Sequence, residues 1–415
     1  MINQLISKIA QRNFIKAMQF EEGKLPQIPS AESKKNRLLY IHIPFCEKLC
    51  PYCSFNRLLL DKNLAHDYFQ ALRKEIVLYK EKGYEFQGLY VGGGTPTILI
   101  EELEETIALA RQCFSIQAIS VETKPDHLTE SKMAALERVG VKRFSVGVQS
   151  FNNDLLKAMG RYDKCGSGEA IAERLRELRG RFDTLNVDMI FNFPQQTMEM
   201  LQRDIDILTD LNIDQITYYP LMVSSSVKEK MNRSFGKINY RQEGQFYHHI
   251  VEQLTKSYNF SSAWCFSRKK AMVDEYIVEY EEYAGLGSGS IGFLDGTCYA
   301  NTFDLREYIE RIHRGELPLI AARNYNIQDQ IRYDFLMKLF GMRLNIPTLQ
   351  QKYNGKAYSH LWLGLLAFML VGGLRYKRSD FFLTKKGRYQ WVLMMREFFI
   401  SVNNFREDCR SRITT

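Results

Sequence analysis

Three cysteines stand within eight residues of the sequence, in the stretch IHIPFCEKLCPYCSF at 41–55. Cys46, Cys50 and Cys53 have the spacing C-x3-C-x2-C. A structural zinc site usually draws four ligands from two separated pairs, and this chain has no second C-x2-C pair. Three thiolates on one loop suit three corners of a [4Fe–4S] cluster, which leaves the fourth iron open for chemistry. Zinc and idle thiols remain as alternatives.

A glycine-rich stretch, YVGGGTPT at 90–97, follows the cysteines by one strand–helix unit. Glycines at 92, 93 and 94 expose backbone amides and carbonyls and allow a ligand to approach closely. Thr95 adds a hydroxyl group, and Pro96 stiffens the exit from the turn. Most glycine runs are only turns. This run, however, is expected on the strand next to the cysteines, so a ligand bound at the open iron would contact both.

Strand-like runs alternate with amphipathic helical stretches over the first two thirds of the chain, and helices are expected at 63–82 and 197–211. Such β–α units predict a parallel sheet curled into a complete or partial barrel, although an open doubly wound sheet gives the same pattern. In both folds, working residues lie where strands end. The six expected strands are 38–43, 86–91, 118–122, 143–149, 185–191 and 215–221.

The character of the sequence changes near residue 323. The stretch 327–354 is helical, and LWLGLLAFMLVGGL at 361–374 predicts a buried helix, since it is about half as long as a membrane span. The stretch 374–395 is typical of a short hairpin leading into a last helix. We therefore expect an N-terminal segment and linker at 1–37, a barrel at 38–320, and a basic, mostly helical, winged-helix-like domain at 321–415.

Composition places the chain among ordinary globular proteins, with 415 residues, 45% hydrophobic and 25% charged. The start lacks a secretory apolar region, and the eight cysteines have no paired spacing outside the cluster, which favours reduced thiols in the cytoplasm. From residue 321 onward there are 16 Lys+Arg against 6 Asp+Glu, which leaves 40 against 42 in the first 320 residues. This basic quarter suggests an anionic partner, either nucleic acid or a carboxylate ligand, or simply a soluble surface.

The cysteine spacing, with Tyr52 before the third cysteine and GGGTPT after it, resembles the radical S-adenosylmethionine superfamily. More narrowly, YIHIPFCEKLCPYCSF, YVGGGTPT, VETKPDHLT, RFSVGVQSFNNDLLKAMGR and NVDMIFNFPQQT resemble, in that order, the oxygen-independent coproporphyrinogen III oxidase family. The resemblance covers about residues 38–310, and LTKKGR with the terminal helix extends it. It implies a partial (β/α)6 barrel with a smaller C-terminal domain.

The resemblance also implies the cofactors, a [4Fe–4S] cluster on Cys46, Cys50 and Cys53, and S-adenosylmethionine. In this superfamily the amino and carboxylate groups of S-adenosylmethionine chelate the free iron, and reduction cleaves the sulfonium to give a deoxyadenosyl radical. The remaining implied roles fall on two groups of residues. Tyr40 would lie near the nucleoside. The methionine amino group would be held by Gly93, Gly94 and Thr95.

Four further residues lie at strand ends or in the following loop, and the resemblance implies that they hold the rest of S-adenosylmethionine. Glu122 would accept hydrogen bonds from ribose or amine, Gln149 and Asp188 would contact the ribose, and Arg161 would pair with the carboxylate. The chemistry agrees, because carboxylates suit amines and hydroxyl groups, and guanidinium suits a carboxylate. Singly, each could be an ordinary surface ion pair or a satisfied core amide.

Three further features favour structural roles. His42 precedes IPFC on the first strand, and a packing role is expected rather than ligation. GLGSGSIGF at 285–293 lacks the helix and ribose acid of a dinucleotide site; the family carries such a stretch near its substrate cavity, and a tight turn is the alternative. Cys265 is expected to be a buried thiol.

The chain departs from coproporphyrinogen oxidases at Phe55, where they have a fourth cysteine, and in its N-terminal stretch, which does not reproduce their extension. The related haem chaperones carry a His-Asn-x-x-Tyr-Trp motif, and this chain has no His-Asn dipeptide. MGRYDKCGSG and MMREFFISVNNFREDCR most resemble a third branch, the anaerobic haem-utilisation enzymes.

The resemblance therefore predicts a radical enzyme acting on a tetrapyrrole, in anaerobic haem utilisation or degradation, with a flavodoxin- or ferredoxin-type electron donor. Three alternatives remain. They are coproporphyrinogen III oxidation, haem carriage without turnover, and RNA modification through the basic C-terminal module. Nucleic acid is disfavoured because no base-stacking platform is identifiable in the sequence. No membrane span is expected.

Overall fold

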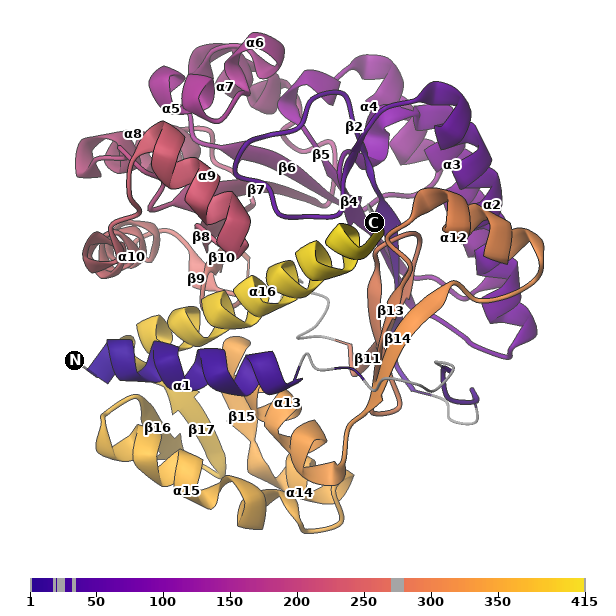
Figure 1. The fold of residues 1–415 in the computed structure, drawn as a ribbon. Coiled ribbons are helices and arrows are strands. Elements are labelled where there is room, and N and C mark those ends of the chain that lie inside the picture. Colours follow the sequence, from indigo (N-terminus) through magenta and orange to yellow (C-terminus); the bar gives the residue numbers. More distant parts are fainter. Residues whose placement is uncertain (1, 18–19, 21–26, 32–34, 270–279, 414–415) are drawn as a thin grey trace.

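The structure is a computed structural model, and it describes residues 2–17, 20, 27–31, 35–269 and 280–413. Its central feature is one twelve-stranded sheet with the strand order β14-β13-β12-β11-β1-β4-β5-β6-β7-β8-β10-β9. The sheet curves around the middle of the molecule, with helices outside it and the long helix α16 crossing below its open side (Figure 1).

Six parallel strands form the middle of the sheet, and each pairs with the next along the chain. A doubly wound sheet would reverse its strand order at a switch point, whereas this order runs in one direction and gives a barrel-type winding. All six strand predictions are confirmed to within two residues at each end. The strands are β1 (Arg37–Ile43), β4 (Gly88–Gly93), β5 (Ala118–Thr123), β6 (Arg143–Gln149), β7 (Thr184–Phe191) and β8 (Gln215–Pro220).

Amphipathic helices connect these strands and cover the outer face of the sheet (Figure 1). Side-chain caps begin several of them, as where Asp61 accepts from the amide of Leu64 and Thr197 from that of Met200. The predicted helices at 63–82 and 197–211 are confirmed by α2 and α8. The helices are α2 (Lys62–Glu81), α3 (Ile100–Cys113), α4 (Glu130–Arg138), α5 (Asn153–Ala158), α6 (Tyr162–Cys165), α7 (Gly168–Glu177), α8 (Met198–Asp210), α9 (Ser225–Phe235) and α10 (Tyr240–Leu254), with 3-10 turns at Pro96–Ile98 and Pro125–His127.

Six more strands extend the sheet on both sides. β11 (Glu282–Leu286) pairs parallel with β1, and β12 (Ile291–Leu294), β13 (Thr297–Asn301) and β14 (Leu319–Asn324) follow it antiparallel; α12 (Leu305–His313) lies between the last two. Beyond β8 lie β10 (Cys265–Ser267) and β9 (Asn259–Phe260). Within the described residues β14 and β9 do not pair with each other, so the barrel is partial.

A smaller, mainly helical part follows the sheet. It contains a three-stranded sheet with the order β15-β17-β16, so the predicted hairpin before the last helix is confirmed. The proposed domain boundary after residue 320 falls inside β14, and the division of the chain stays a proposal. The elements are α13 (Ile327–Phe340), β15 (Arg343–Asn345), α14 (Ile346–Lys352), α15 (Ala357–Leu370), β16 (Leu374–Lys377), β17 (Asp380–Leu383) and α16 (Lys385–Ile413).

One expectation about this part is wrong. The apolar stretch 361–374 was expected to form a buried helix, but α15 buries only one side. Leu361 and Leu365 are buried, whereas Leu363 is 62% exposed and Leu370 is 79% exposed. Composition alone misled here, because a helix without charges still buries only the face that another element covers.

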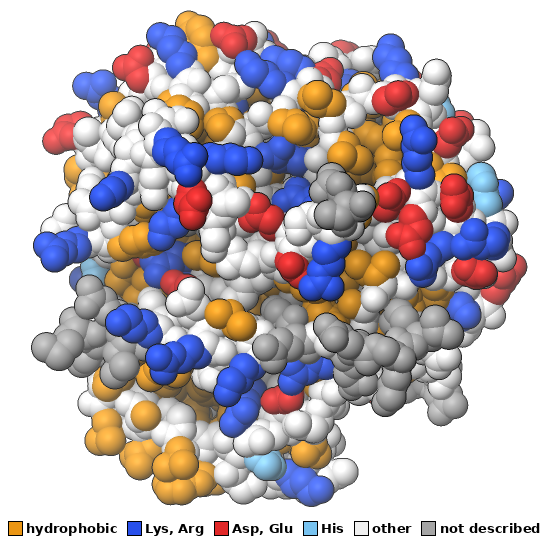
Figure 2. Space-filling view, viewed as in Figure 1, with side chains coloured by type: hydrophobic (Ala, Val, Ile, Leu, Met, Phe, Trp, Pro, Cys, Tyr) orange, Lys and Arg blue, Asp and Glu red, His pale blue; other side chains and the backbone are white. Residues whose placement is uncertain are grey.

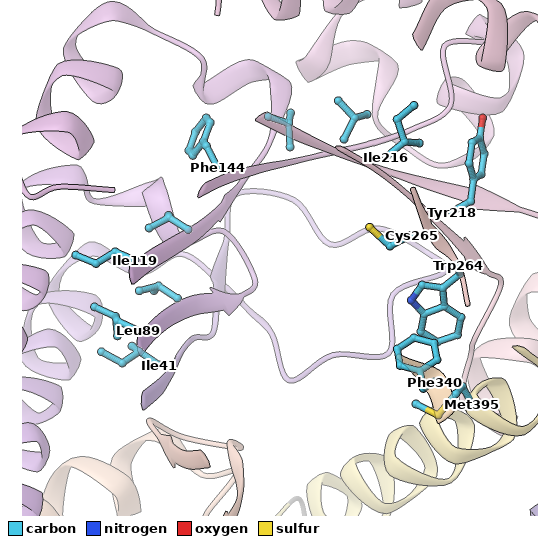
Figure 3. Close-up of a cluster of buried hydrophobic side chains, with 14 of the residues drawn as sticks. Ile41, Leu89, Ile119, Phe144, Ile216, Tyr218, Trp264, Cys265, Phe340 and Met395 are labelled. Carbon is cyan, nitrogen blue, oxygen red and sulfur yellow. The ribbon is translucent and has the colours of Figure 1, made fainter. Parts of the chain in front are cut away.

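The hydrophobic core continues from the barrel into the C-terminal part. Strand side chains such as Ile41 and Phe144 fill the space under the outer helices (Figure 3). Beside β10, the Trp264 and Phe340 rings are 4.7 Å apart, and Figure 3 shows them next to Met395 of α16. The helix α1 (Ile2–Ala17) lies along α16, so segments from both ends of the chain pack side by side (Figure 1).

Candidate functional site

A cavity of about 340 Å³ opens at the carboxyl ends of the parallel strands. In a parallel barrel this end is where loops gather functional side chains. Ten of the eleven residues predicted from the sequence line the cavity, and the eleventh, Thr95, is buried directly behind Cys46. The ten are Tyr40, Cys46, Cys50, Cys53, Gly93, Gly94, Glu122, Gln149, Arg161 and Asp188.

The three cysteines reach the cavity on the loop after β1. Cys46 lies in the short strand β2 (Phe45–Cys46), which pairs with β3 (Leu58–Leu59), while Cys50 and Cys53 are half-buried in the turn between them. Arg57 closes this turn, since its Nη2 donates to the Cys50 carbonyl at 2.8 Å and to the Cys53 carbonyl at 2.6 Å. The loop therefore holds all three thiols at one cavity.

Burial raises the pKa of the Cys46 thiol, and the hydrogen bond from Thr95 Oγ1 at 3.6 Å lowers it in part. The neighbouring thiols Cys53 and Cys50 raise it as well, which reflects how near the three sulfurs are to one another. Thiolates that repel one another in this way are stabilised when they bind a common cation.

The glycine run forms a tight cradle beside the cysteines. A Cβ atom on Gly94 would lie 2.6 Å from the Phe45 carbonyl oxygen and 2.9 Å from Cys46 Sγ. Gly93 has a φ of +122°, and a Cβ atom there would lie 2.7 Å from the Ile43 carbonyl oxygen. Only glycine fits at both positions, and the backbone of β4 is therefore exposed directly next to the thiols.

The first strand contributes an ordered Tyr–His pair to the cavity. The Tyr40 hydroxyl lies 2.9 Å from His42 Nδ1, and His42 Nε2 lies 2.8 Å from the Asn56 carbonyl oxygen. Because that carbonyl can only accept, Nε2 carries the proton and Nδ1 accepts from Tyr40. Burial lowers the pKa of His42 to about 4, so the ring is neutral. His42 thus has the structural role expected of it, and it fixes the direction of the Tyr40 hydroxyl.

Two carboxylates face the cavity from neighbouring parts of the sheet. Glu122 on β5 accepts from the Tyr90 hydroxyl at 2.7 Å and from the Gly93 amide at 3.3 Å. Burial, and then the charge of Asp188, raise the pKa of Glu122 to about 7. Asp188 on β7 accepts from Ser145 Oγ at 2.6 Å. Both carboxylates are therefore held in fixed positions that a ligand with hydroxyl or amino groups could use.

Gln149 and Arg161 complete this side of the cavity. Gln149 ends β6 at a register irregularity and has a φ of +77°, which turns its side chain out of the regular strand pattern. Arg161 is buried and donates through Nη2 to the Gly147 carbonyl. Its Nε is buried with no hydrogen-bond partner among the residues that the structure describes. A buried guanidinium with an unused donor suits an anionic ligand group.

The opposite wall of the cavity is aromatic and was not predicted from the sequence. It comes from the flanking strands β11–β13 and from the C-terminal helices, so no local motif marks it. The hydroxyls of this wall have partners, as Tyr325 does with the Cys298 thiol. The wall residues are Tyr283, Ile291, Phe293, Cys298, Tyr325, Tyr333, Met337, Phe398, Phe399 and Val402.

Guanidinium groups gather where this wall meets the cysteine loop. Arg406 of α16 lies over the Phe55 ring at 5.2 Å, and Arg410 donates to the Phe55 carbonyl at 3.0 Å. Burial, and then the charge of Arg57, lower the pKa of Arg410. Three cations thus flank the position at which coproporphyrinogen oxidases have their fourth cysteine.

The family model of the radical SAM superfamily matches residues 40–208, which span β1 to α8 and include every residue predicted for the cofactors. The chain carries a radical SAM domain. Radical SAM proteins use a [4Fe–4S] cluster and S-adenosylmethionine, so these are the cofactors that the cavity has to accommodate. The residues present fit them: three converging thiols, a glycine cradle and the unused donor of Arg161.

Sequence relatives of this chain carry two different names. It is 27% identical over 370 residues to the haem chaperone HemW of Bacillus subtilis, which covers 84% of this chain and 95% of the relative. It is 26% identical over 345 residues to the oxygen-independent coproporphyrinogen III oxidase of Escherichia coli, covering 76% and 74%. Because the chain is about equally similar to the chaperone and to the oxidase, sequence identity does not distinguish between these two functions.

The solved structure of coproporphyrinogen III oxidase (HemN) from Escherichia coli superposes with a TM-score of 0.74 and covers 90% of this chain and 91% of that one. The sequence identity in this superposition is 23%, so the likeness shows the fold. The α/β fold with its partial barrel and helical C-terminal part is confirmed.

Other candidate features are structural. Cys265 is fully buried in β10, as expected. The stretch 285–293 runs from the end of β11 into β12, and only Ile291 and Phe293 of it line the cavity. Glu47, Asp126 and His127 lie together, but lysines 124 and 164 already pair with Glu47. Among the described residues, no helix is long and apolar enough to cross a membrane.

Proposed function

We propose that this protein is a radical SAM enzyme that reductively cleaves S-adenosylmethionine to act on a tetrapyrrole, in anaerobic haem utilisation or degradation. The observation that carries the proposal is the cavity itself. One wall holds three thiols and the polar side chains for S-adenosylmethionine, and the other wall is aromatic and edged by arginines. These two walls support a cofactor site and a substrate site that share one cavity.

The cofactor half rests on side-chain chemistry. Cys46, Cys50 and Cys53 would hold the cluster, which leaves one iron for the amino and carboxylate groups of S-adenosylmethionine. When bound, these cofactors supply a carbon-centred radical able to abstract hydrogen. Gly93, Gly94 and Thr95 would hold the amino group, and Arg161 would pair with the carboxylate.

The nucleoside would lie between Tyr40 and the two carboxylates. Glu122 and Asp188 would accept from the amine and ribose hydroxyl groups, with Gln149 beside them. The hydrogen bond from the Tyr40 hydroxyl to His42 fixes the direction of this hydroxyl beside the ligand. The chain's own part in the reaction is therefore to bind, to orient and to exclude water.

The substrate half rests on shape and charge. A tetrapyrrole has flat apolar faces and carboxylate side chains. Tyr283, Phe293 and Tyr333 offer aromatic faces on the far wall, and Arg57 and Arg406 offer guanidinium groups at its edge. The relatives named haem chaperone and coproporphyrinogen III oxidase support the same class of ligand.

Two other functions compete with this one. Haem carriage without turnover is favoured by the HemW relatives, which are named chaperones. Coproporphyrinogen III oxidation is favoured by the oxidase relatives but disfavoured by Phe55, which lies on the cavity wall in place of a cysteine. This chain has neither the fourth cysteine of the oxidases nor the His-Asn dipeptide of the haem chaperones, which favours the haem-utilisation branch over both.

The test is turnover with each tetrapyrrole. The protein is reconstituted without oxygen and given reductant, S-adenosylmethionine and either haem or coproporphyrinogen III, and products are followed by mass spectrometry. Deoxyadenosine together with modified haem is expected. Loss of porphyrinogen carboxyl groups would support the oxidase instead, and tight haem binding without cleavage would support the carrier.

We further propose a flavodoxin- or ferredoxin-type electron donor, because cluster reduction needs a one-electron carrier of low potential. All eight cysteines are free, which is in keeping with a reducing compartment and supports a cytoplasmic location.

A further inference from the structure

The helix α15 turns a continuous apolar face to solvent. Tyr358, Trp362, Leu366 and Leu370 recur every four residues and so form one ridge along the helix, with Leu363 beside it. These five residues, which we call the α15 face, are all exposed. Figure 2 shows hydrophobic side chains gathered at the lower left of the molecule, where Figure 1 places α15.

A face of this kind requires a partner. Single exposed leucines are common on protein surfaces, but several neighbouring large apolar side chains mark an interaction site. Helix α15 contains no Asp, Glu, Lys or Arg, so no charged side chain of its own interrupts the face. The partner must therefore offer an apolar surface over the length of the helix.

The chain on both sides of α15 is basic. Residues 335–379 contain seven Lys and Arg and no Asp or Glu. Lys356, Arg375, Lys377 and Arg378 are exposed next to α15 along the chain. The nearest acids in sequence are buried and paired: Asp334 with Lys352 at 2.8 Å and Asp380 with Arg343 at 2.6 Å.

We propose that the α15 face docks on the surface of an anionic lipid bilayer. The leucines would enter the acyl region, Trp362 and Tyr358 would lie at the headgroup level, and the basic side chains would reach the phosphates. An apolar centre flanked by basic side chains is what such a surface selects. The attachment is peripheral, which agrees with the absence of a spanning helix among the described residues.

Other partners fit these observations less well. Nucleic acid would meet apolar side chains on α15 where phosphates need cations. A second copy of the chain would bring two basic borders together, which costs free energy. An acidic electron donor has to approach the cluster, and Figure 1 places α15 and the cysteine strand β2 at opposite ends of the molecule.

The tryptophans supply a direct assay. Trp264 and Trp391 are fully buried, whereas Trp362 is exposed, so a change in the emission of the folded protein on docking reports on Trp362. The full-length protein is titrated with vesicles of phosphatidylcholine containing phosphatidylglycerol, and with phosphatidylcholine alone. We expect a blue shift and protection from acrylamide with the anionic vesicles, weakened by high salt. Trp362→Phe should bind but lose the shift.

Variants locate the contact. Leu363→Glu with Leu370→Glu should weaken vesicle partitioning by about tenfold or more, since two inserted side chains become charged. The matched control is Val77→Glu on α2, which is also an exposed apolar position and should bind like the unaltered protein. Lys356→Gln with Lys377→Gln should weaken binding to anionic vesicles only.

Each of the following results would overturn the proposal. They are no vesicle binding by the folded protein, equal binding by the Leu363→Glu, Leu370→Glu variant, or a concentration-dependent dimer in sedimentation that this variant abolishes. Preferred binding of RNA through the same residues would also reject it. Because none of these measurements involves turnover, they stand apart from the test of the proposed function.

Discussion

At the scale of residues, the three cysteines share a loop but not an environment. Cys46 is buried against the glycine cradle, whereas Cys50 and Cys53 lie half-exposed in the turn that Arg57 closes. This arrangement leaves the cavity side of the loop open to a ligand. The roles of these residues stay predictions, and single substitutions can test them.

Replacing Cys50 by Ala removes one of three thiolates that would hold the cluster. We expect the variant, reconstituted without oxygen, to lose most of its iron and all cleavage of S-adenosylmethionine, because a cubane held by two thiolates is labile. Iron content and deoxyadenosine are the measurements. Cys113→Ala, which removes a half-buried cysteine outside the loop, is the control. Retained cleavage in Cys50→Ala would reject the cluster assignment.

Glu122 should make S-adenosylmethionine binding depend on pH. Its pKa is raised to about 7, so it is ionised above that pH and neutral below it. Ligand donors favour the ionised form, so affinity should fall as pH drops from 8 to 6, by about tenfold for one such group. Calorimetry should show this loss of affinity for S-adenosylmethionine in the unaltered protein. The surface variant Glu101→Gln is the control and should show the same loss.

Glu122→Gln should bind more weakly and lack that part of the pH dependence. Comparing the two proteins cancels the titration of the ligand itself, which is the same in both. If the glutamine variant shows the same ratio of dissociation constants between pH 6 and pH 8, then Glu122 does not contact the ligand.

At the scale of elements, the sequence predicted the strands and motifs that short local patterns encode. Strand runs rich in Val, Ile and Phe, such as 143–149, predicted β1 and β4 to β8, and motifs at their ends gave the polar side of the cavity. The aromatic wall was missed because Tyr283 and Phe398 meet only through tertiary packing. The burial of α15 was wrong because an apolar composition indicates a preference for burial and does not show that a neighbour supplies it.

The buried ion pair between α10 and α16 should hold the cavity wall in place. Arg396 donates to Glu243, and both side chains are almost fully buried. Arg396→Met would leave a buried carboxylate unpaired, which typically costs about 3–5 kcal/mol. Chemical denaturation should show this loss, and adding Glu243→Gln should restore part of it.

The control for that experiment is Arg314→Met, which breaks an exposed pair with Glu316. An exposed pair is worth less than about 1 kcal/mol, so its loss should hardly change the denaturation midpoint. Equal losses in Arg396→Met and Arg314→Met would mean that the buried pair does not hold α16 against α10.

At the scale of the whole molecule, stability should fall between pH 5.5 and pH 7.5 through buried acids. Burial raises the pKa of Asp204 to about 7, although it accepts from Ser150 and Phe151. The unfolded state gives up this proton near pH 4, so the folded state binds the extra proton between pH 4 and 7. The contribution of Asp204 to the free energy of unfolding is fully present at low pH. It decreases as pH rises, by about 2 kcal/mol between pH 5.5 and pH 7.5.

Asp204→Asn should remove that contribution, so its denaturation midpoint should fall less between the two pH values than that of the unaltered protein. Asp210→Asn, which changes an exposed acid in the same helix, should keep the full slope. An unchanged slope in Asp204→Asn would assign the pH dependence to other groups.

The position of α16 has a consequence for how the protein is made. This helix follows every other described element along the chain, yet it supplies Phe398, Val402 and Arg406 to the cavity wall and reaches the cysteine loop through Arg410. During synthesis the barrel can therefore form while the thiols still face an open trough. The cavity wall is complete only after α16 has packed against the barrel, so a cluster assembled before that step would enter an open site.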